Sequence, residues 1–187
     1  MSGKVRIIGG EWKGRKLTVG HSPGLRPTSD RLRETLFNWL TWHIEGSICL
    51  DLFAGSGALG IEAASRGAKK IILVEKNRSL AQTLVEQIIN LNTPKIEVIQ
   101  TEATHFLQRS PIPFDIVFLD PPFQDNLLTV CCQQLEQRNW LATHAHIYLE
   151  MAKDSVAPEL PTNWQIIRQK TMGQVACLLA KRSDNTS

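Results

Sequence analysis

The four residues Asp120-Pro121-Pro122-Phe123 combine groups that could hold a flat base by its exocyclic amine. They follow an apolar run, residues 114–119, which predicts a buried strand. Two consecutive prolines end that strand and stiffen the backbone after it. The Asp120 carboxylate and the Pro121 carbonyl can each accept one N–H, and the Phe123 ring can stack on the base. A plain Pro-Pro turn at a strand end fits the four residues equally well, so a second motif is needed.

A glycine-rich segment supplies that second motif. Residues 51–60 read Asp-Leu-Phe-Ala-Gly-Ser-Gly-Ala-Leu-Gly and follow a short apolar strand that begins at Ile48. The glycines allow a tight turn and a close approach of a ligand to the backbone. Their spacing matches the dinucleotide fingerprint, which is a weak signal by itself. Glu75 ends the next predicted strand and could accept hydrogen bonds from both ribose hydroxyls of an adenosine cofactor.

The charge of Asp51 indicates which adenosine cofactor fits. A dinucleotide places its pyrophosphate at the helix N-terminus that follows the loop, where Asp51 would repel it. S-adenosylmethionine has no phosphate and carries a positive sulfonium and an ammonium. Asp51 could attract that ammonium, and Asp120 adds negative charge nearby. We therefore predict S-adenosylmethionine, with S-adenosylhomocysteine as the product.

Together the two motifs resemble the Rossmann-like methyltransferases that use S-adenosylmethionine to methylate amines. Their nucleotide-binding loop is similar to residues 51–60, and their (D/N)-P-P-(Y/F/W) tetrapeptide is similar to residues 120–123. The whole chain further resembles the bacterial family that methylates N2 of one guanine in 16S ribosomal RNA. That narrower resemblance is carried by residues 6–10, 13–17, 26–28, 31–38 and 173–175. One departure is visible, because residues 101–103 are Thr-Glu-Ala where the family usually has Ser-Asp-Ala.

The resemblance implies a function and a set of site residues. The function is methyl transfer to the N2 amine of guanine 966 in 16S rRNA of the small ribosomal subunit. The residues implied for catalysis are Asp120, Pro121 and Phe123. Those assigned to the cofactor are Thr28, Asp51, Phe53, Gly55, Ser56, Gly57, Gly60, Glu75, Lys76, Glu102, Ala103 and Asp120. Thr28 is placed near the methionine end by resemblance alone, and it fits a helix cap equally well.

The residues leave other functions open. A nicotinamide-linked oxidoreductase could use the glycine-rich loop, although it would leave the tetrapeptide without a role. A non-catalytic RNA-binding protein could keep the same fold. An adenine-N6 methyltransferase shares both motifs, but the chain has no separate domain for target recognition. Cytosine-carbon methylation requires a nucleophilic cysteine, and no cysteine is near the tetrapeptide in sequence.

Positive charge is concentrated at the N-terminus. Residues 1–33 hold eight basic and two acidic residues, a net charge of +6, whereas the remaining chain is at −3. A positive end beside a nearly neutral body favours the docking of a polyanion, although a solvated hairpin edged with lysines would also fit. The predicted RNA-binding residues are Lys4, Arg6, Lys13, Arg15, Lys16 and Arg26.

Composition describes an ordinary cytoplasmic protein. The 187 residues are 42% hydrophobic and 21% charged, which fits one packed domain. No apolar run approaches the roughly 20 residues of a membrane span, and the first residues lack the apolar core of a signal peptide. The four cysteines lack Cys-x-x-Cys spacing and are expected to be reduced. His144 and His146 alone do not support a metal site, so we expect no metal. We also expect a monomer, because nothing in the sequence requires a larger assembly.

Alternating strands and helices predict an α/β fold with a mostly parallel, seven-stranded sheet, preceded by an N-terminal β-hairpin. Predicted strands span residues 4–8, 14–19, 48–53, 70–75, 96–101, 114–120, about 146–151, 164–170 and 174–181. Predicted helices start near Ser29, capped by Thr28 or Ser29, and span residues 58–66, 78–91, 103–108 and 126–137. We expect a hairpin extension over residues 1–27, the methyltransferase domain over residues 28–182 and a disordered tail over residues 183–187.

Overall fold

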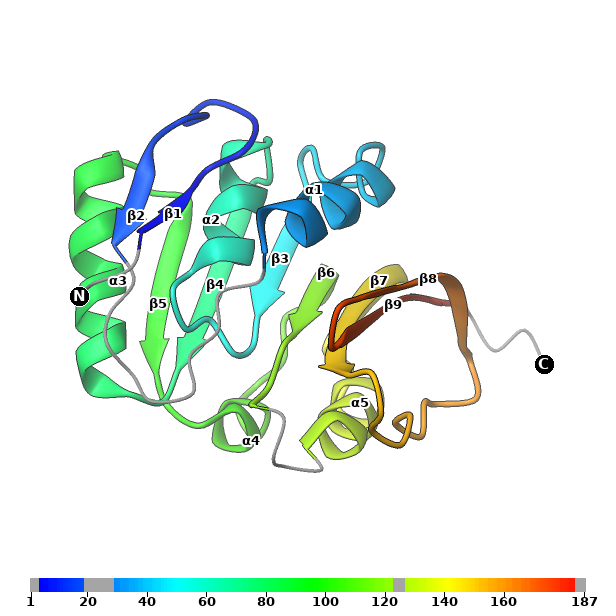
Figure 1. The fold of residues 1–187 in the computed structure, drawn as a ribbon. Helices are drawn as coiled ribbons and strands as arrows, with labels where there is room; N and C mark the ends of the chain where they lie inside the picture. Colours follow the sequence, from blue (N-terminus) through cyan, green and yellow to red (C-terminus); the bar gives the residue numbers. More distant parts are fainter. Residues whose placement is uncertain (1–3, 19–28, 123–126, 184–187) are drawn as a thin grey trace.

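A single mixed sheet forms the centre of the computed structural model, which describes residues 4–18, 29–122 and 127–183 (Figure 1). Its strands are β3 (Ile48–Asp51), β4 (Lys70–Glu75), β5 (Ile96–Gln100), β6 (Phe114–Leu119), β7 (Leu141–Ala152), β8 (Trp164–Met172) and β9 (Val175–Arg182). They lie in the order β5-β4-β3-β6-β7-β9-β8. The first five strands of that order are parallel, and β9 runs antiparallel to both neighbours. The predicted seven-stranded, mostly parallel sheet is confirmed.

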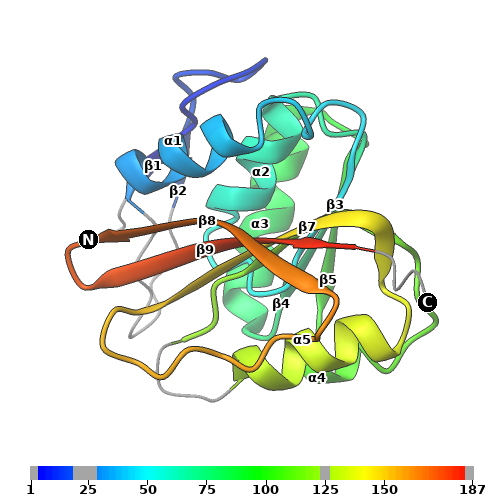
Figure 2. The same ribbon diagram turned by 90° about the vertical axis from the view of Figure 1, so that its right-hand side faces the viewer.

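Helices cover both faces of the sheet (Figure 2). They are α1 (Asp30–Trp39), α2 (Ala58–Ser65), α3 (Arg78–Leu91), α4 (Ala103–Phe106) and α5 (Leu127–Gln137). The first three pack over Cys49 and Phe118 of the sheet, in one hydrophobic cluster. The other two pack over Leu50 and Val117, in a second cluster. Successive strand residues point to opposite faces, so neighbouring residues of β3 and β6 belong to different halves of the core.

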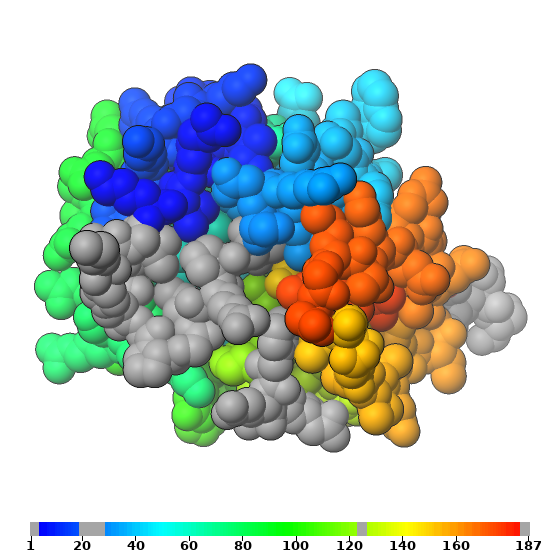
Figure 3. Space-filling view, viewed as in Figure 1, coloured from blue at the N-terminus to red at the C-terminus, as the bar shows by residue number. Residues whose placement is uncertain are grey.

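The N-terminal hairpin is built of β1 (Lys4–Arg6) and β2 (Lys16–Thr18), which pair antiparallel as a separate two-stranded sheet. Its apolar side chains Ile7, Trp12 and Leu17 are buried in the same cluster as α1, α2 and α3. The hairpin therefore shares the core of the main sheet, and Figure 3 shows its dark-blue atoms at the surface beside those of α1.

Most predicted elements lie where the sequence placed them, and α3 has the predicted bounds. Ser29 caps α1, since its hydroxyl accepts the N–H of Leu32 at 3.3 Å.

The prediction for β7 was wrong, because the strand begins at Leu141, five residues earlier than expected. Its first half carries exposed Thr143 and His144, which hid the apolar pattern. The two hairpin strands are also shorter than predicted, because the segment between them turns twice at Gly10 and Gly14, both with positive φ.

The four cysteines are free and buried, as predicted. Burial raises the pKa of the Cys49 thiol to about 12, and the pKa of Cys131 to about 12. These thiols stay protonated at neutral pH and are poor nucleophiles. Within the described ranges, no helix is long and apolar enough to cross a membrane.

Candidate active site

The carboxyl ends of β4, β3 and β6 meet at one edge of the sheet, and the glycine-rich loop lies between them. The loop is tied to both neighbouring strands by backbone hydrogen bonds. The N–H of Leu52 donates to the carbonyl of Phe118 at 3.1 Å, and that of Ala54 donates to Val74 at 2.9 Å. Ligands of open α/β sheets bind at this edge, so the loop lies where a cofactor is expected.

Two glycines of the loop have specific structural tasks. Gly57 caps α2 with a φ of 76°, a conformation that side chains disfavour. Gly60 lies in the first turn of α2, where an added Cβ would meet the side chain of Leu73 at 2.3 Å. Gly60 therefore lets α2 pack closely against β4, and the helix begins at the loop with no intervening residues.

Asp51 lies beneath the loop and is 1% exposed. Its carboxylate accepts the N–H of Gly60 at 3.0 Å. Burial raises the pKa of Asp51 to about 7, although hydrogen bonds from the backbone of Gly60 and Phe53 oppose the shift. A carboxylate with its ionised form penalised in this way gains from a nearby cation. The predicted attraction for a positive group thus has a physical basis, while the direct contacts of Asp51 are with the loop itself.

Glu75 joins the loop to the next strand. One carboxylate oxygen accepts the N–H of Gly55 at 2.8 Å, and the other accepts that of Asn77 at 2.7 Å. Each carboxylate oxygen has a second lone pair, so both can also accept from a ribose hydroxyl. Glu75 is 8% exposed, and its position at the end of β4 agrees with the predicted role.

The other predicted cofactor residues surround this edge. The N–H of Thr101 donates to the carbonyl of Glu75 at 3.2 Å, which brings Glu102 and Ala103 beside β4. Glu102 is exposed at the N-cap of α4, and its side chain makes no capping hydrogen bond. The side chain of Lys76 is exposed and that of Phe53 is partly exposed, whereas Ser56 is buried.

The tetrapeptide begins as β6 ends. Asp120 is partly exposed, Pro121 is buried and Pro122 is exposed. Phe123 lies outside the described residues, as do Thr28 and Arg26, so their roles stay predictions. The strand register places Asp120 two residues beyond the level of Asp51, since Asp51 lies opposite Phe118. Two residues of strand correspond to about 7 Å, which puts Asp120 farther out along the strand direction than Asp51.

Sequence reasoning missed a further acid, Glu150. Leu119 of β6 lies opposite Leu149 of β7, so the residues that follow, Asp120 and Glu150, are level on neighbouring parallel strands. Glu150 is 4% exposed and accepts the hydroxyl of Tyr148 at 2.9 Å. Burial, followed by the charge of Glu150, raises the pKa of Tyr148 well above its ordinary value. The signal was available, because Glu150 interrupts an apolar run at the end of a predicted strand.

These acids form a row along one face of the sheet. Side chains alternate between faces, and Cys49, Leu73, Phe118 and Tyr148 all belong to the cluster under α1, α2 and α3. Residues two positions later point the same way. They are Asp51 and Glu75 at the ends of β3 and β4, Asp120 directly after β6, and Glu150 two residues before the end of β7. Such a row suits a ligand that carries positive charge.

Five of the six predicted RNA-binding residues lie on the hairpin, and the sixth, Arg26, lies outside the described residues. The side chains of Lys4, Arg6, Lys13, Arg15 and Lys16 are exposed. Arg33, which contributes to the basic N-terminal count, is fully buried and bonds within the molecule. The exposed positive charge of this region is therefore smaller than the sequence count.

A buried carboxylate holds the hairpin, and the sequence did not point to it. Glu62 of α2 is fully buried and accepts the N–H groups of Ile8 and Gly9, both at 2.8 Å. It also pairs with Arg66 at 2.7 Å and with Arg33 at 3.4 Å. A buried acid in a small-residue helix is the signal that could have revealed it.

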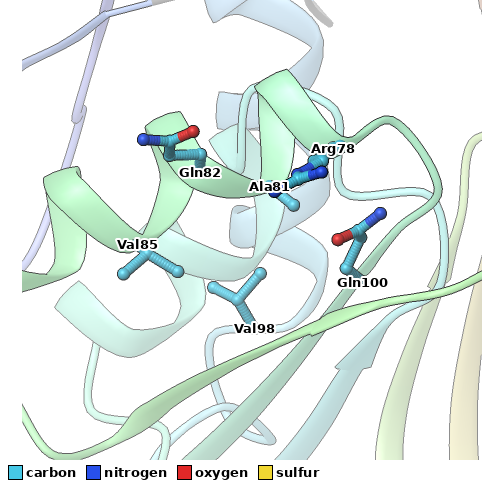
Figure 4. Close-up of a pocket in the computed structure, with 6 residues that line it drawn as sticks. All are labelled: Arg78, Ala81, Gln82, Val85, Val98 and Gln100. Carbon is cyan, nitrogen blue, oxygen red and sulfur yellow. The ribbon is translucent and has the colours of Figure 1, made fainter.

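Two remaining features lie away from the strand ends. A shallow hollow of about 210 Å³ lies between α3 and β5 and is lined by Arg78, Ala81, Gln82, Val85, Val98 and Gln100 (Figure 4). No predicted site residue lines it.

His146 is buried and stacks on His43 with ring centroids 4.1 Å apart. Burial lowers the pKa of His146 to about 4, and in the described part of the chain no group of three metal-binding side chains occurs.

Known proteins match nearly the whole chain. A family model described as Conserved hypothetical protein 95 matches residues 5–181. Ribosomal RNA small subunit methyltransferase D of Escherichia coli is 49% identical over 97% of this chain and 91% of that protein. The Haemophilus influenzae protein of the same name is 48% identical over 93% of this chain and 92% of its own. The solved structure of yhhF, a putative methyltransferase from Escherichia coli, has a TM-score of 0.91 at 45% identity and covers 97% of this chain and 99% of its own.

Proposed function

The chain belongs to the family described as Conserved hypothetical protein 95, and from this premise we propose that it is a 16S rRNA guanine-N2 methyltransferase that uses S-adenosylmethionine. It transfers a methyl group to the exocyclic amine of guanine 966 in the small ribosomal subunit. The row of acids beside the glycine-rich loop is the observation within this chain that best supports the cofactor.

The residues at the strand ends fit S-adenosylmethionine. This cofactor supplies a methyl group on a positively charged sulfonium. Buried Asp51, with its raised pKa, gains from a nearby positive charge. Glu75 keeps lone pairs for ribose hydroxyls while it holds Gly55. Phosphate would be repelled by the same acids, which argues against a dinucleotide.

Asp120 and Pro121 hold the guanine amine. The lone pair of this amine is delocalised into the ring, so the nitrogen is a poor nucleophile. The Asp120 carboxylate accepts one N–H and the Pro121 carbonyl accepts the other, which orients the amine for in-line attack. Much of the rate enhancement then comes from positioning. The rigid Pro121-Pro122 backbone suits this task because it keeps the carbonyl in place.

The negative charge at this edge also stabilises the transition state. As the new C–N bond forms and the methyl–sulfur bond breaks, positive charge would move from sulfur to the amine nitrogen. S-adenosylhomocysteine would leave, and the nitrogen would lose one N–H proton to Asp120 or to water. Asp120 follows β6 and is level with Glu150 of β7, and fixed carboxylates at this edge favour the positive nitrogen. Phe123 stacks on the base, by analogy with other base–aromatic contacts.

The exposed basic residues of the hairpin bind rRNA phosphates. Lys4, Arg6, Lys13, Arg15 and Lys16 are exposed on one small element, and clustered basic residues of this kind attract a polyanion. The target guanine must be unpaired or turned out of its stack to reach Asp120.

The test is methyl transfer from labelled S-adenosylmethionine to unmodified small subunits and to free 16S rRNA, followed by nucleoside analysis. Label in N2-methylguanosine is the expected result, and the better substrate identifies the stage at which the enzyme acts. Label in N6-methyladenosine would keep the chemistry and overturn the substrate. No transfer to either RNA, with the cofactor bound, would overturn the proposed function.

A further inference from the structure

The hairpin is attached to α2 through two residues on one side of that helix. Glu62 accepts the N–H groups of Ile8 and Gly9. Ser65 donates its hydroxyl to the carbonyl of Gly9 at 2.6 Å and accepts the N–H of Trp12 at 2.9 Å. Residues three apart share a helix face, so this side of α2 presents a continuous set of partners to residues 8–12.

The attachment is close as well as polar. Gly10 has a φ of 77°, and an added Cβ would lie 1.8 Å from the carbonyl oxygen of Ser65. That carbonyl accepts the N–H of Glu11 at 2.7 Å. The backbone of the hairpin thus touches the backbone of α2, with no room for an intervening side chain.

Charge in this attachment is balanced within the protein. The Glu62 carboxylate is shared by the guanidinium groups of Arg33 and Arg66. Arg33 also donates to the carbonyl of Arg6 at 2.8 Å, which ties the hairpin to α1. The basic side chains that remain exposed, such as Arg15 and Lys16, are available to a polyanion.

The opposite end of α2 holds the cofactor loop. The helix begins directly after Gly57, and the N–H of Gly60 in its first turn donates to Asp51. Eight helical residues span about 12 Å. One short, fully buried helix therefore connects the loop at the strand ends to the segment that anchors the basic hairpin.

We propose that Glu62 and Ser65 are positioning residues for rRNA, which set the basic hairpin at a fixed place relative to the methyl-transfer site. The proposal rests on the proposed function, because it assumes that the hairpin binds rRNA. Neither residue touches the substrate. They act by holding the backbone of residues 8–12, so that the exposed basic side chains meet phosphates while the guanine lies at Asp120.

A role in stability alone would give a different pattern. A residue that only stabilises the fold affects methylation through the amount of folded enzyme. A positioning residue affects the KM for rRNA, leaves the affinity for S-adenosylmethionine unchanged, and couples to the hairpin charges. A double-mutant cycle separates the two roles, because independent sites are additive and coupled sites are not.

The experiment combines Ser65→Ala with the charge variant Arg15→Gln/Lys16→Gln and measures KM for unmodified small subunits, kcat and cofactor affinity. Loss of the two hydroxyl hydrogen bonds should raise the KM about threefold to tenfold, with kcat and cofactor affinity within about twofold of wild type. The charge variant should raise the KM by itself. In the Ser65→Ala background, the charge variant should change the logarithm of the KM by about half as much, or less, as it does in the wild type.

Two further variants make the result decisive. Gly10→Ala displaces the hairpin while leaving Glu62 and Ser65 intact, and it should raise the KM as Ser65→Ala does. Ile147→Val lowers stability in the core under α5, on the face of the sheet away from the hairpin, and it should leave the KM unchanged.

The outcomes distinguish the two proposals. A wild-type enzyme that methylates neither RNA would overturn the function and the positioning role together. Methylation by the wild type with no effect of the charge variant would refute the positioning role and leave the function standing. Strict additivity of Ser65→Ala and the charge variant, or an equal rise of KM in Ile147→Val, would also refute the positioning role.

Discussion

Buried carboxylates occur in two regions of this protein, at the cofactor edge of the sheet and beneath the hairpin. In both places they accept backbone N–H groups, as Asp51 does from Gly60 and Glu62 does from Ile8 and Gly9. The difference lies in their cations. Glu62 pairs with two arginines, whereas within the described residues neither Asp51 nor Glu75 forms an ion pair.

This difference separates a structural use of charge from a functional one. Beneath the hairpin Arg33 and Arg66 are matched by two carboxylates, Glu62 and Asp30, so the charges cancel and the network needs no charge from outside. At the strand ends neither Asp51 nor Glu75 has a cationic partner among the described residues, and burial penalises the ionised form of Asp51 and raises its pKa. An external cation would relieve that cost. The comparison predicts opposite responses to substitution in the two regions.

The largest effect is expected for Glu62→Ala. The substitution leaves the buried Arg33 with the exposed Asp30 as its remaining partner and removes the acceptor of two backbone N–H groups. The free energy of unfolding should fall by about 3–5 kcal/mol, as for other broken buried ion pairs. Urea unfolding measures this, with the exposed Glu86→Ala of α3 as the control. A loss below about 1 kcal/mol would remove the contrast between the regions.

Asp120→Ala should lower activity and leave stability almost unchanged, unlike Glu62→Ala. We expect kcat to fall by about 10²–10³-fold or more, equal to about 3–4 kcal/mol of transition-state stabilisation, because an oriented acceptor and a fixed charge are lost. The free energy of unfolding should change little, since Asp120 is partly exposed. Single-turnover methylation measures the loss, with Asp154→Ala in the exposed turn after β7 as the control. Wild-type activity in Asp120→Ala would refute the mechanism.

The pKa of Asp51 predicts a pH dependence of stability. Because its folded pKa is raised to about 7 from 3.8, the folded chain binds a proton between about pH 4 and 7 that the unfolded chain has released. The Asp51 contribution therefore destabilises the fold progressively as pH rises through this window, by about 4 kcal/mol above pH 7.

The variant Asp51→Asn isolates this contribution. The difference in free energy of unfolding between the variant and the wild type, measured from pH 5 to 8, should grow with pH in favour of the variant. Saturating S-adenosylmethionine should reduce the pH dependence of the wild type, because a cation favours the ionised carboxylate. A difference that is flat across the range would mean that Asp51 titrates normally.

Glu150→Gln should give the smallest change. The amide oxygen of the substituted side chain can still accept the hydroxyl of Tyr148, so the fold should be kept while one negative charge beside Asp120 is lost. We expect kcat to fall about tenfold, since a nearby charge is removed and the acceptors of the amine remain. Tyr148→Phe, which keeps the charge and removes its hydroxyl partner, should cost less. Equal losses in both variants would indicate that Glu150 acts only through Tyr148.

The parts of the fold that could be predicted are those with a local pattern. Three local patterns each predict one element. The helical spacing of apolar residues predicts α3, an unbroken apolar run predicts β6, and the glycines after β3 predict a tight turn. The site residues predicted at strand ends follow from the same patterns, because parallel strands bring their carboxyl ends to one edge. For this reason the sequence alone predicts Asp51, Glu75 and Asp120 at the same edge of the sheet.

The unpredicted parts depend on contacts between distant segments. Glu62 and Ile8 are 54 residues apart, and no local pattern links an acid in a helix to the turn of a hairpin. Arg33 was counted as part of a basic surface, since sequence alone does not reveal that α1 turns it inward. Glu150 stands out as an acid in an apolar run, but its place level with Asp120 comes from the β6–β7 register, which a strand pattern leaves undetermined.

The position of β9 between β7 and β8 has a consequence for biosynthesis. The strand β9, Val175–Arg182, inserts between β8 and β7, which carries Glu150 near its end. A chain emerging from its amino terminus can pair β3, β4, β5, β6 and β7 in turn, but β9 can insert beside β7 only once β8 and β9 have also been translated. Until then β7, which carries Glu150, is an edge strand of the sheet, with one side of its backbone unpaired.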